Sequence, residues 1–143
     1  MPSAHVQENV EAVLAAYARF NADGWAAEDL GIWDEAGEFH PAPEDPEFSV
    51  HRGIDAIRRH YASWVDAYPD LTLEPVEASG CGDTVFLWLH CSGRGRESEV
   101  PLSMRLAHVI TMRDGRMTRV LVYLSRSEAL RAAGLSECAE LSP

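Results

Sequence analysis

Residues 83–124 read DTVFLWLHCSGRGRESEVPLSMRLAHVITMRDGRMTRVLVYL, and this stretch decides the fold. Two polar breaks that contain glycine divide its long apolar runs. Asp114-Gly115 is a strong signal for a tight β-hairpin, and Gly93-Arg94-Gly95-Arg96 predicts a second turn. Because strands joined by short turns run antiparallel, we expect three successive antiparallel strands: Thr84–Ser92, Glu99–Met112 and Met117–Leu124.

The sequence before this stretch is predicted to supply helices that cover one face of the sheet. Apolar residues recur at helical spacing in three places. The predicted helices are His5–Asn21, Trp25–Trp33 and a segment from Ile54 to Tyr68, and the short extended pieces are Gly37–His40 and Phe48–Arg52.

The remaining elements flank the three long strands. Leu71 and Leu73 alternate as in a half-buried strand, which Pro75 assigns to a sheet edge or a bulge. Ser125 and Glu128 form a capping box that opens a last, short helix. We find neither a linker nor a repeat, so residues 1–143 are predicted to form a single α+β domain.

Charge and composition exclude several classes of function. The formal charge is −11, from 23 acidic and 12 basic residues. Such a charge repels phosphate backbones and anionic lipids, so we expect neither a nucleic acid nor a membrane partner. All the basic residues are arginine. Without lysine, the chain cannot form a Schiff base or a Walker-type phosphate loop.

The cysteines and histidines indicate neither a disulfide framework nor a metal site. The three cysteines are odd in number and form no CxxC pair, and we find no signal peptide. These features predict a reducing, cytoplasmic setting. The six histidines show neither HxH nor HExxH spacing. We therefore expect no metal and no other cofactor.

Short motifs along nearly the whole chain carry a resemblance to a known family. They are Phe20–Trp25, Phe39–Pro41, His51–Ile57, Gly82–Val85, Met112–Arg116 and Glu128–Leu135. Together they resemble the NTF2-like superfamily, specifically its SnoaL-like branch of small bacterial proteins. The resemblance implies a cone of three N-terminal helices over a curved, mostly antiparallel sheet, with a short C-terminal helix. It also implies a deep apolar pocket inside the cone and a homodimer through the convex sheet face.

The superfamily includes steroid isomerases, polyketide cyclases, epoxide hydrolases, dehydratases and pure binding domains. By the resemblance, His40-Pro41 occupies the place of the isomerase base, so His40 is the candidate catalytic residue. The isomerase tyrosine falls near Ala16, one residue from Tyr17, and the second isomerase acid falls near Ala107. An imidazole in an apolar cavity can move a proton near neutral pH. The alternative is a histidine at a strand end that bonds only to a neighbouring backbone group.

The epoxide hydrolase triad is absent from this chain. By the resemblance, its arginine and two aspartates would stand at Val85, Leu87 and Val122, which are all apolar here. The resemblance therefore does not imply epoxide hydrolysis. These three residues would instead form the dry wall of a pocket for a small apolar molecule.

Three further residues are candidates for ligand binding. Tyr17 and Trp33 are expected near the pocket mouth, whereas helically spaced Tyr61 and Trp64 are typical of plain core. Arg105 interrupts an apolar run and could pair with an anionic ligand if it faces inward. If it faces outward, it would cross a dimer interface instead, and a third option is that it pairs with the acidic Glu97–Glu99 stretch.

The sequence leaves two functions open. One is an enzyme of the isomerase, cyclase or lyase type, in which His40 transfers a proton on an apolar substrate without metal. The other is a non-catalytic protein that binds a small apolar metabolite. A dimeric interaction domain with a filled core is a third, weaker hypothesis.

Overall fold

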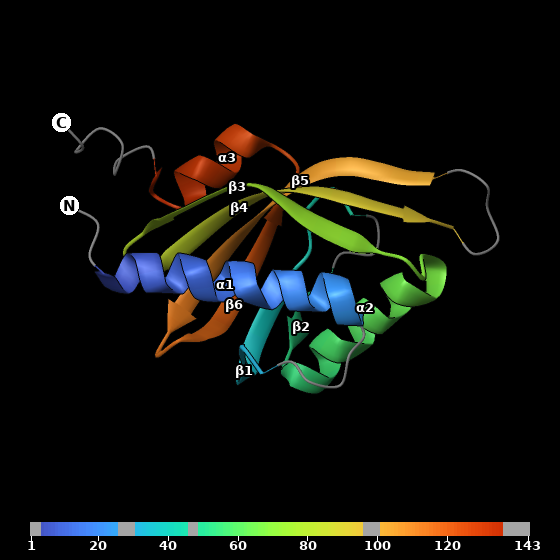
Figure 1. Cartoon of the computed structure of the whole chain (residues 1–143), viewed down its shortest axis with the longest axis horizontal. Coiled ribbons are helices and arrows are strands. Elements are labelled where there is room, and N and C mark those ends of the chain that lie inside the picture. The colour runs from blue at the N-terminus through green and yellow to red at the C-terminus, as the bar shows by residue number, and fades with distance from the viewer. Residues whose placement is uncertain (1–3, 26–30, 46–48, 96–100, 136–143) are drawn as a thin grey trace.

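A curved, six-stranded mixed sheet forms the centre of the protein, in a computed structural model that describes residues 4–25, 31–45, 49–95 and 101–135 (Figure 1). The strands follow the order β2-β1-β6-β5-β4-β3. They are β1 (Trp33–His40), β2 (His51–Arg52), β3 (Thr72–Cys81), β4 (Thr84–Arg94), β5 (Pro101–Arg113) and β6 (Arg116–Tyr123). The helices are α1 (Ala4–Asp23), α2 (Ile54–Ala67) and α3 (Arg126–Ala132).

The strand pairing confirms that residues 83–124 form three successive antiparallel strands, as the sequence predicted. β4 pairs antiparallel with β5, and β5 pairs antiparallel with β6. β3 pairs antiparallel with the other side of β4. Asp114 and Gly115 both have positive φ, 53° and 78°, which is the geometry of a type I′ hairpin turn. β3 lies at the sheet edge and bulges between Pro75 and Glu77. The one parallel pair in the sheet is β1 with β6.

The predicted helix over Trp25–Trp33 is not a helix in the residues that the structure describes. Residues 26–30 lie outside the described residues, but Gly31 and Ile32 form a turn and Trp33 begins β1. Trp33 pairs with Met117 of β6, and the Ile32 carbonyl accepts a hydrogen bond from the Met117 amide at 2.7 Å. Pairing with β6 thus overrides the local apolar pattern. Within the described part of the chain, two helices precede the long strands.

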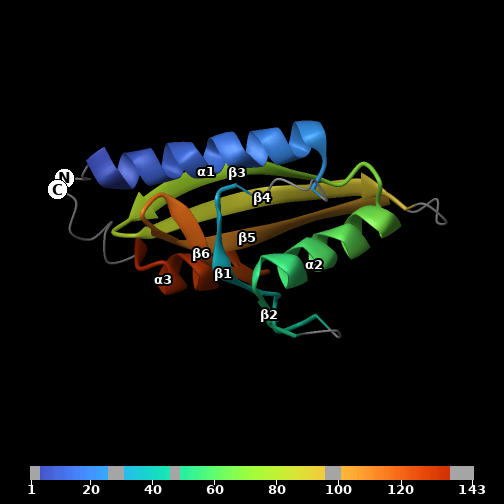
Figure 2. The same ribbon diagram turned by 90° about the horizontal axis from the view of Figure 1, so that it is seen from below.

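The helices cover opposite faces of the sheet. Figure 2 shows α1 on one side and α3 on the other, with α2 beside β1 and β2. α1 buries a stripe at helical spacing that packs on the concave face: Val13, Ala16, Tyr17 and Phe20. The approach is close enough that a Cβ on Gly80 of β3 would lie 2.7 Å from Val6.

On the convex face, a smaller apolar cluster forms under α3. Phe86, Ala107 and Val109 pack there against Ala129 and Ala133. The Ser125 hydroxyl accepts a hydrogen bond from the Glu128 amide at the start of α3, which confirms the predicted cap.

Asn21 ties the end of α1 to the edge strand β3. Its side-chain amide donates to the Leu73 carbonyl and accepts from the Leu73 amide, both at 2.9 Å. The same oxygen accepts from the Trp25 indole at 2.7 Å. One side chain therefore fixes the helix end, the strand and the aromatic residue that follows the helix.

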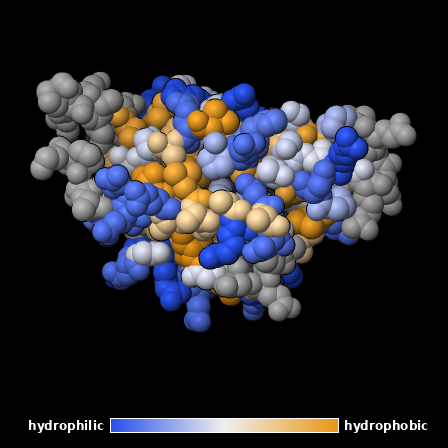
Figure 3. Space-filling model, in the orientation of Figure 1, coloured by the Kyte–Doolittle hydropathy of each residue, from blue (hydrophilic) through white to orange (hydrophobic). Residues whose placement is uncertain are grey.

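The face in the view of Figure 1 is mainly hydrophilic at its rim, and hydrophobic residues gather over its centre (Figure 3). Among the helices that the structure describes, none combines the length and apolar character that a membrane crossing requires.

Cys91 is a free, buried thiol, whereas Cys81 takes part in a disulfide bond. The odd number of cysteines and their spacing did not lead us to expect a disulfide.

Candidate functional site

An apolar cavity of about 300 Å³ opens between α2 and the concave face of the sheet. Its walls are mostly carbon, from residues that include Phe39, Trp64, Leu73, Leu106 and Val122. Polar groups reach it at few points: His60 and Tyr61 of α2, Cys91 of β4, His108 of β5, and Glu44 and Asp45 of the loop after β1. A mostly apolar cavity with a few convergent polar groups is typical of a small-molecule site.

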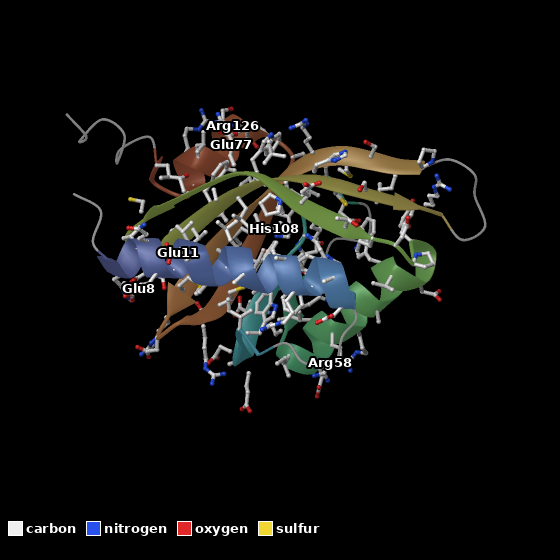
Figure 4. All side chains as sticks on the ribbon, viewed as in Figure 1. Glu8, Glu11, Arg58, Glu77, His108 and Arg126 are labelled. Atoms are coloured by element: carbon white, nitrogen blue, oxygen red, sulfur yellow. The ribbon has the colours of Figure 1, made fainter. Side chains whose placement is uncertain are left out.

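His108 is the most deeply buried of the polar groups in the cavity wall. It lies in the interior between α1 and the sheet (Figure 4) and is 2% exposed. Its Nδ1 lies 2.7 Å from the Tyr17 hydroxyl. The Tyr17 bond occupies Nδ1 and leaves Nε2 as the ring nitrogen available to a ligand.

Burial keeps both members of this pair uncharged near neutral pH. Desolvation, with a smaller contribution from the charge of His60, lowers the pKa of His108 to about 3. Desolvation also raises the pKa of Tyr17 well above its ordinary value. A neutral imidazole that is hydrogen-bonded at one nitrogen offers a single donor or acceptor at the other, depending on its tautomer.

A second imidazole, His60, lies at the outer part of the cavity wall. The centroid of its ring lies 4.4 Å from that of His51 and 4.6 Å from that of Phe39, with both pairs of rings tilted. Desolvation, followed by the charge of His51, lowers the pKa of His60 to about 4, although Asp45 opposes the shift. Phe39 also touches His108 edge to face, with ring centroids 6.0 Å apart. Phe39 thus contacts the deep and the outer imidazole.

The structure places His40 outside the cavity. Phe39 points into it, and the alternation along β1 directs His40 to the other face of the sheet, beside Glu38. The two side chains are joined by a 2.9 Å hydrogen bond between Nε2 and Oε1, which lowers the pKa of Glu38. The catalytic role of His40 stays a prediction, and the position of its side chain relative to the cavity gives it no support.

The other predicted residues divide between cavity, core and surface. Val122 lines the cavity, while Val85 and Leu87 are fully buried on the concave face and are not part of its lining. Trp33 is buried in the core at the start of β1. Arg105 is exposed opposite His90, on the outward side of β5. Of the two directions that the sequence left open for this side chain, the structure has the outward one.

Sequence reasoning missed His108 although a signal was present. Along β5, Leu102, Met104 and Leu106 are half-buried while Ser103 and Arg105 are exposed. Extending that alternation places residue 108 on the cavity face and Ala107 on the opposite face, under α3. The resemblance points to Ala107, one residue before His108, just as it points to Ala16, one residue before Tyr17. Among the described residues, no group of three or more potential ligands could hold a metal ion.

The family follows from a match to the model of the SnoaL-like domain over residues 10–120. The chain belongs to the SnoaL-like family. This places it in the NTF2-like superfamily, as its motifs predicted. No protein with a curated description matches the sequence.

Solved structures of other SnoaL-like and NTF2-like proteins share the fold at low sequence identity. SalBIII, an epoxide hydrolase/cyclase-like enzyme with a role in pyran ring formation in salinomycin, is 19% identical with a TM-score of 0.70, covering 85% of this chain and 93% of its own. A Catenulispora acidiphila protein with a ketosteroid isomerase-like fold, in complex with trimethylamine, is 19% identical with a TM-score of 0.65 and coverages of 90% and 94%. An NTF2-like protein from Burkholderia xenovorans is 23% identical with a TM-score of 0.66 and coverages of 90% and 97%.

Proposed function

We propose that this SnoaL-like protein binds a small, largely apolar molecule in the cavity and moves a proton on it, in chemistry of the isomerase, cyclase or lyase type. The observation that carries the proposal is His108 in the mostly apolar cavity wall, held at Nδ1 by the buried Tyr17 hydroxyl. Enzymes with this fold include the epoxide hydrolase/cyclase-like SalBIII. The triad comparison argues against epoxide hydrolysis here, because Val85, Leu87 and Val122 cannot activate water.

His108 is suited to hold a carbonyl or hydroxyl oxygen of the substrate. In the tautomer protonated at Nε2, the Tyr17 hydroxyl donates to Nδ1, and Nε2–H is free to donate to a substrate oxygen. A neutral imidazole can polarise a carbonyl in this way without a metal. The dry surroundings strengthen that bond, because water does not compete for the oxygen.

His60 is the candidate proton acceptor. It lines the same cavity and is uncharged at neutral pH, since its pKa lies at about 4. An uncharged imidazole can take a proton from a carbon next to the polarised carbonyl and return it at another position. His108 and His60 would thus act from the deep and the outer part of the cavity.

The test is proton exchange on carbonyl compounds. The protein is incubated with a panel of aryl ketones and cyclic enones in D₂O, and deuterium uptake is followed by NMR. Substitution of His108 or His60 by Ala or Gln should slow deuterium exchange on these compounds by about 10²–10⁴-fold. His40→Gln is the matched control and should exchange at the wild-type rate. If His40→Gln is inactive while His108→Ala is active, the proton transfer belongs to His40.

A non-catalytic binding protein is the second candidate, and a specific observation favours it. Histidines with pKa values of about 4 and about 3 are weak bases, so neither His60 nor His108 gives much driving force for proton abstraction. In that case the cavity would bind an apolar metabolite, and His108 would hydrogen-bond its polar end. Saturable binding without exchange for every compound that binds would support this function.

We also propose that two copies associate through the convex sheet face. α3 covers Phe86, but Trp88, Leu121 and Tyr123 remain half-buried beside it. An apolar sheet face beyond the reach of the covering helix favours a partner surface. This arrangement would leave the cavity on the opposite, concave side accessible.

A further inference from the structure

A second and more polar hollow adjoins the apolar cavity along α2. This groove has a volume of about 640 Å³. It shares four wall residues with the cavity: Pro41, Asp45, His60 and Trp64. The rest of its lining is His51, Tyr68 at the residue after α2, and one stripe of α2 made of Ala56, Arg59, Ser63 and Ala67. These α2 residues recur at intervals of three and four and therefore lie on one side of the helix.

The groove presents an arginine, Arg59, in a chain whose 23 acidic residues outnumber its 12 basic ones and whose formal charge is −11. Arg59 is exposed and makes no ion pair with any residue that the structure describes. His51 and His60 supply two imidazoles in ring contact. Asp45 is the one carboxylate among the described lining residues, and its charge acts on both imidazoles.

An aromatic surface connects the cavity with the groove. Trp64 lines both hollows, and its ring stacks with that of Tyr68 at 6.0 Å and 24°. A flat or elongated apolar molecule in the cavity can therefore extend over Trp64 toward the groove without meeting water on its inner side. Its outer end would then reach the polar stripe of α2.

We propose that the groove is the subsite for an anionic end of the ligand, so that the protein selects amphipathic carboxylates. The apolar body lies in the cavity, and the carboxylate pairs with Arg59 at the outer end. A guanidinium binds a carboxylate through two parallel N–H donors, which gives direction as well as charge. Asp45 repels the carboxylate from the inner end and so favours the position at Arg59. This inference rests on the proposed ligand-binding role of the cavity.

The test compares a carboxylate with its uncharged ester. Naphthylacetic acid and its methyl ester share one apolar body, and isothermal titration calorimetry measures the affinity of each for the full chain near pH 7. An exposed ion pair gives up to about fivefold in affinity. We expect the acid to bind about fivefold more tightly than the ester to the wild type. Arg59→Gln should abolish that difference and leave the affinity for the ester unchanged.

Arg58→Gln is the matched control, because Arg58 neighbours Arg59 in sequence but pairs with Asp55 and is not part of the groove lining. This variant should keep the preference for the acid. Equal affinity of the wild type for acid and ester, or a preference that survives in Arg59→Gln, would overturn the subsite while the cavity still binds the ester. If neither compound binds, the ligand-binding role of the cavity and the subsite both fail.

Discussion

The Tyr17 hydroxyl lies 2.7 Å from Nδ1 of His108, although the two residues are 91 positions apart in the sequence. The bond joins α1 to the middle of β5 at the deep end of the cavity. Both side chains are almost completely buried, so neither group has water as an alternative partner. This contact fixes the orientation of the His108 ring and thereby which nitrogen meets a ligand.

Tyr17→Phe should destabilise the protein although it removes a single oxygen atom. The change leaves Nδ1 of His108 buried without a partner, which costs about 1–3 kcal/mol in the free energy of unfolding. Urea denaturation measures this loss. Tyr68→Phe is the control, because the Tyr68 ring stacks on Trp64 at the groove and is only half-buried. A Tyr17→Phe protein as stable as the wild type would show that the bond contributes nothing.

Acid should destabilise the protein well above the pH at which carboxylates titrate. The unfolded chain protonates His60 and His108 near pH 6.5, whereas the folded protein does so only at pKa values of about 4 and about 3. Below pH 6.5 the unfolded state therefore binds more protons, and the free energy of unfolding falls by about 1.4 kcal/mol per pH unit for each histidine. The loss continues down to the two folded pKa values.

Urea titrations between about pH 7 and 5 measure this slope. His60→Gln should reduce the slope by the contribution of one histidine, about 1.4 kcal/mol per pH unit. His90→Gln is the control, because His90 lies on the outward side of β4 and bonds to Ser103. An unchanged slope in His60→Gln would mean that His60 is protonated equally in the folded and unfolded states.

Asn21→Leu should destabilise the protein by about 2–3 kcal/mol. It leaves the Leu73 amide and carbonyl and the Trp25 indole without the partner that now satisfies all three. Asn21→Asp keeps an acceptor oxygen but loses the donor to the Leu73 carbonyl, so its loss should be smaller. Thermal unfolding ranks the two variants. The reverse ranking would show that size at position 21 matters more than hydrogen bonding.

Much of the fold could be predicted from local signals. A type I′ turn requires positive φ at two successive residues, and Asp-Gly is one of the few dipeptides that adopt it readily. The hairpin at Asp114-Gly115 could therefore be predicted from the sequence. Pro75 lacks an amide hydrogen and so belongs at an edge or bulge, and β3 has both. The segment that ends at Trp33 was misread, because its strand exists through pairing with β6, a partner more than eighty residues away.

The site was harder to predict because a shift of one residue in a strand reverses the side chain's direction. His40 was chosen on its place before Pro41, but alternation along β1 puts Phe39 into the cavity instead. His108 was not among the candidates because the resemblance points to Ala107, one residue before it. The sequence did contain a signal for it, because apolar Leu102, Met104 and Leu106 alternate with polar Ser103 and Arg105 and so place residue 108 on the face of Leu106.

Trp88→Glu should separate the proposed homodimer. Trp88 lies on the convex face beside α3, where a buried carboxylate would oppose association. Analytical ultracentrifugation at micromolar concentration should give a dimer for the wild type and a monomer for the variant. Val76→Glu changes an exposed residue at the bulge of β3 and should remain dimeric. A wild type that sediments only as a 15.8 kDa species would rule out self-association through this face.

The most direct test of the account is the ¹⁵N NMR signal of the histidine rings during titration with naphthyl methyl ketone. This probe is apolar except for one carbonyl oxygen, which suits an apolar cavity that has His108 at its deep end. The account predicts that Nε2 of His108 shifts in a saturable way, that the His40 signals stay in place, and that His108→Phe weakens binding. A ketone that binds while perturbing the His40 ring and leaving His108 unchanged would contradict it.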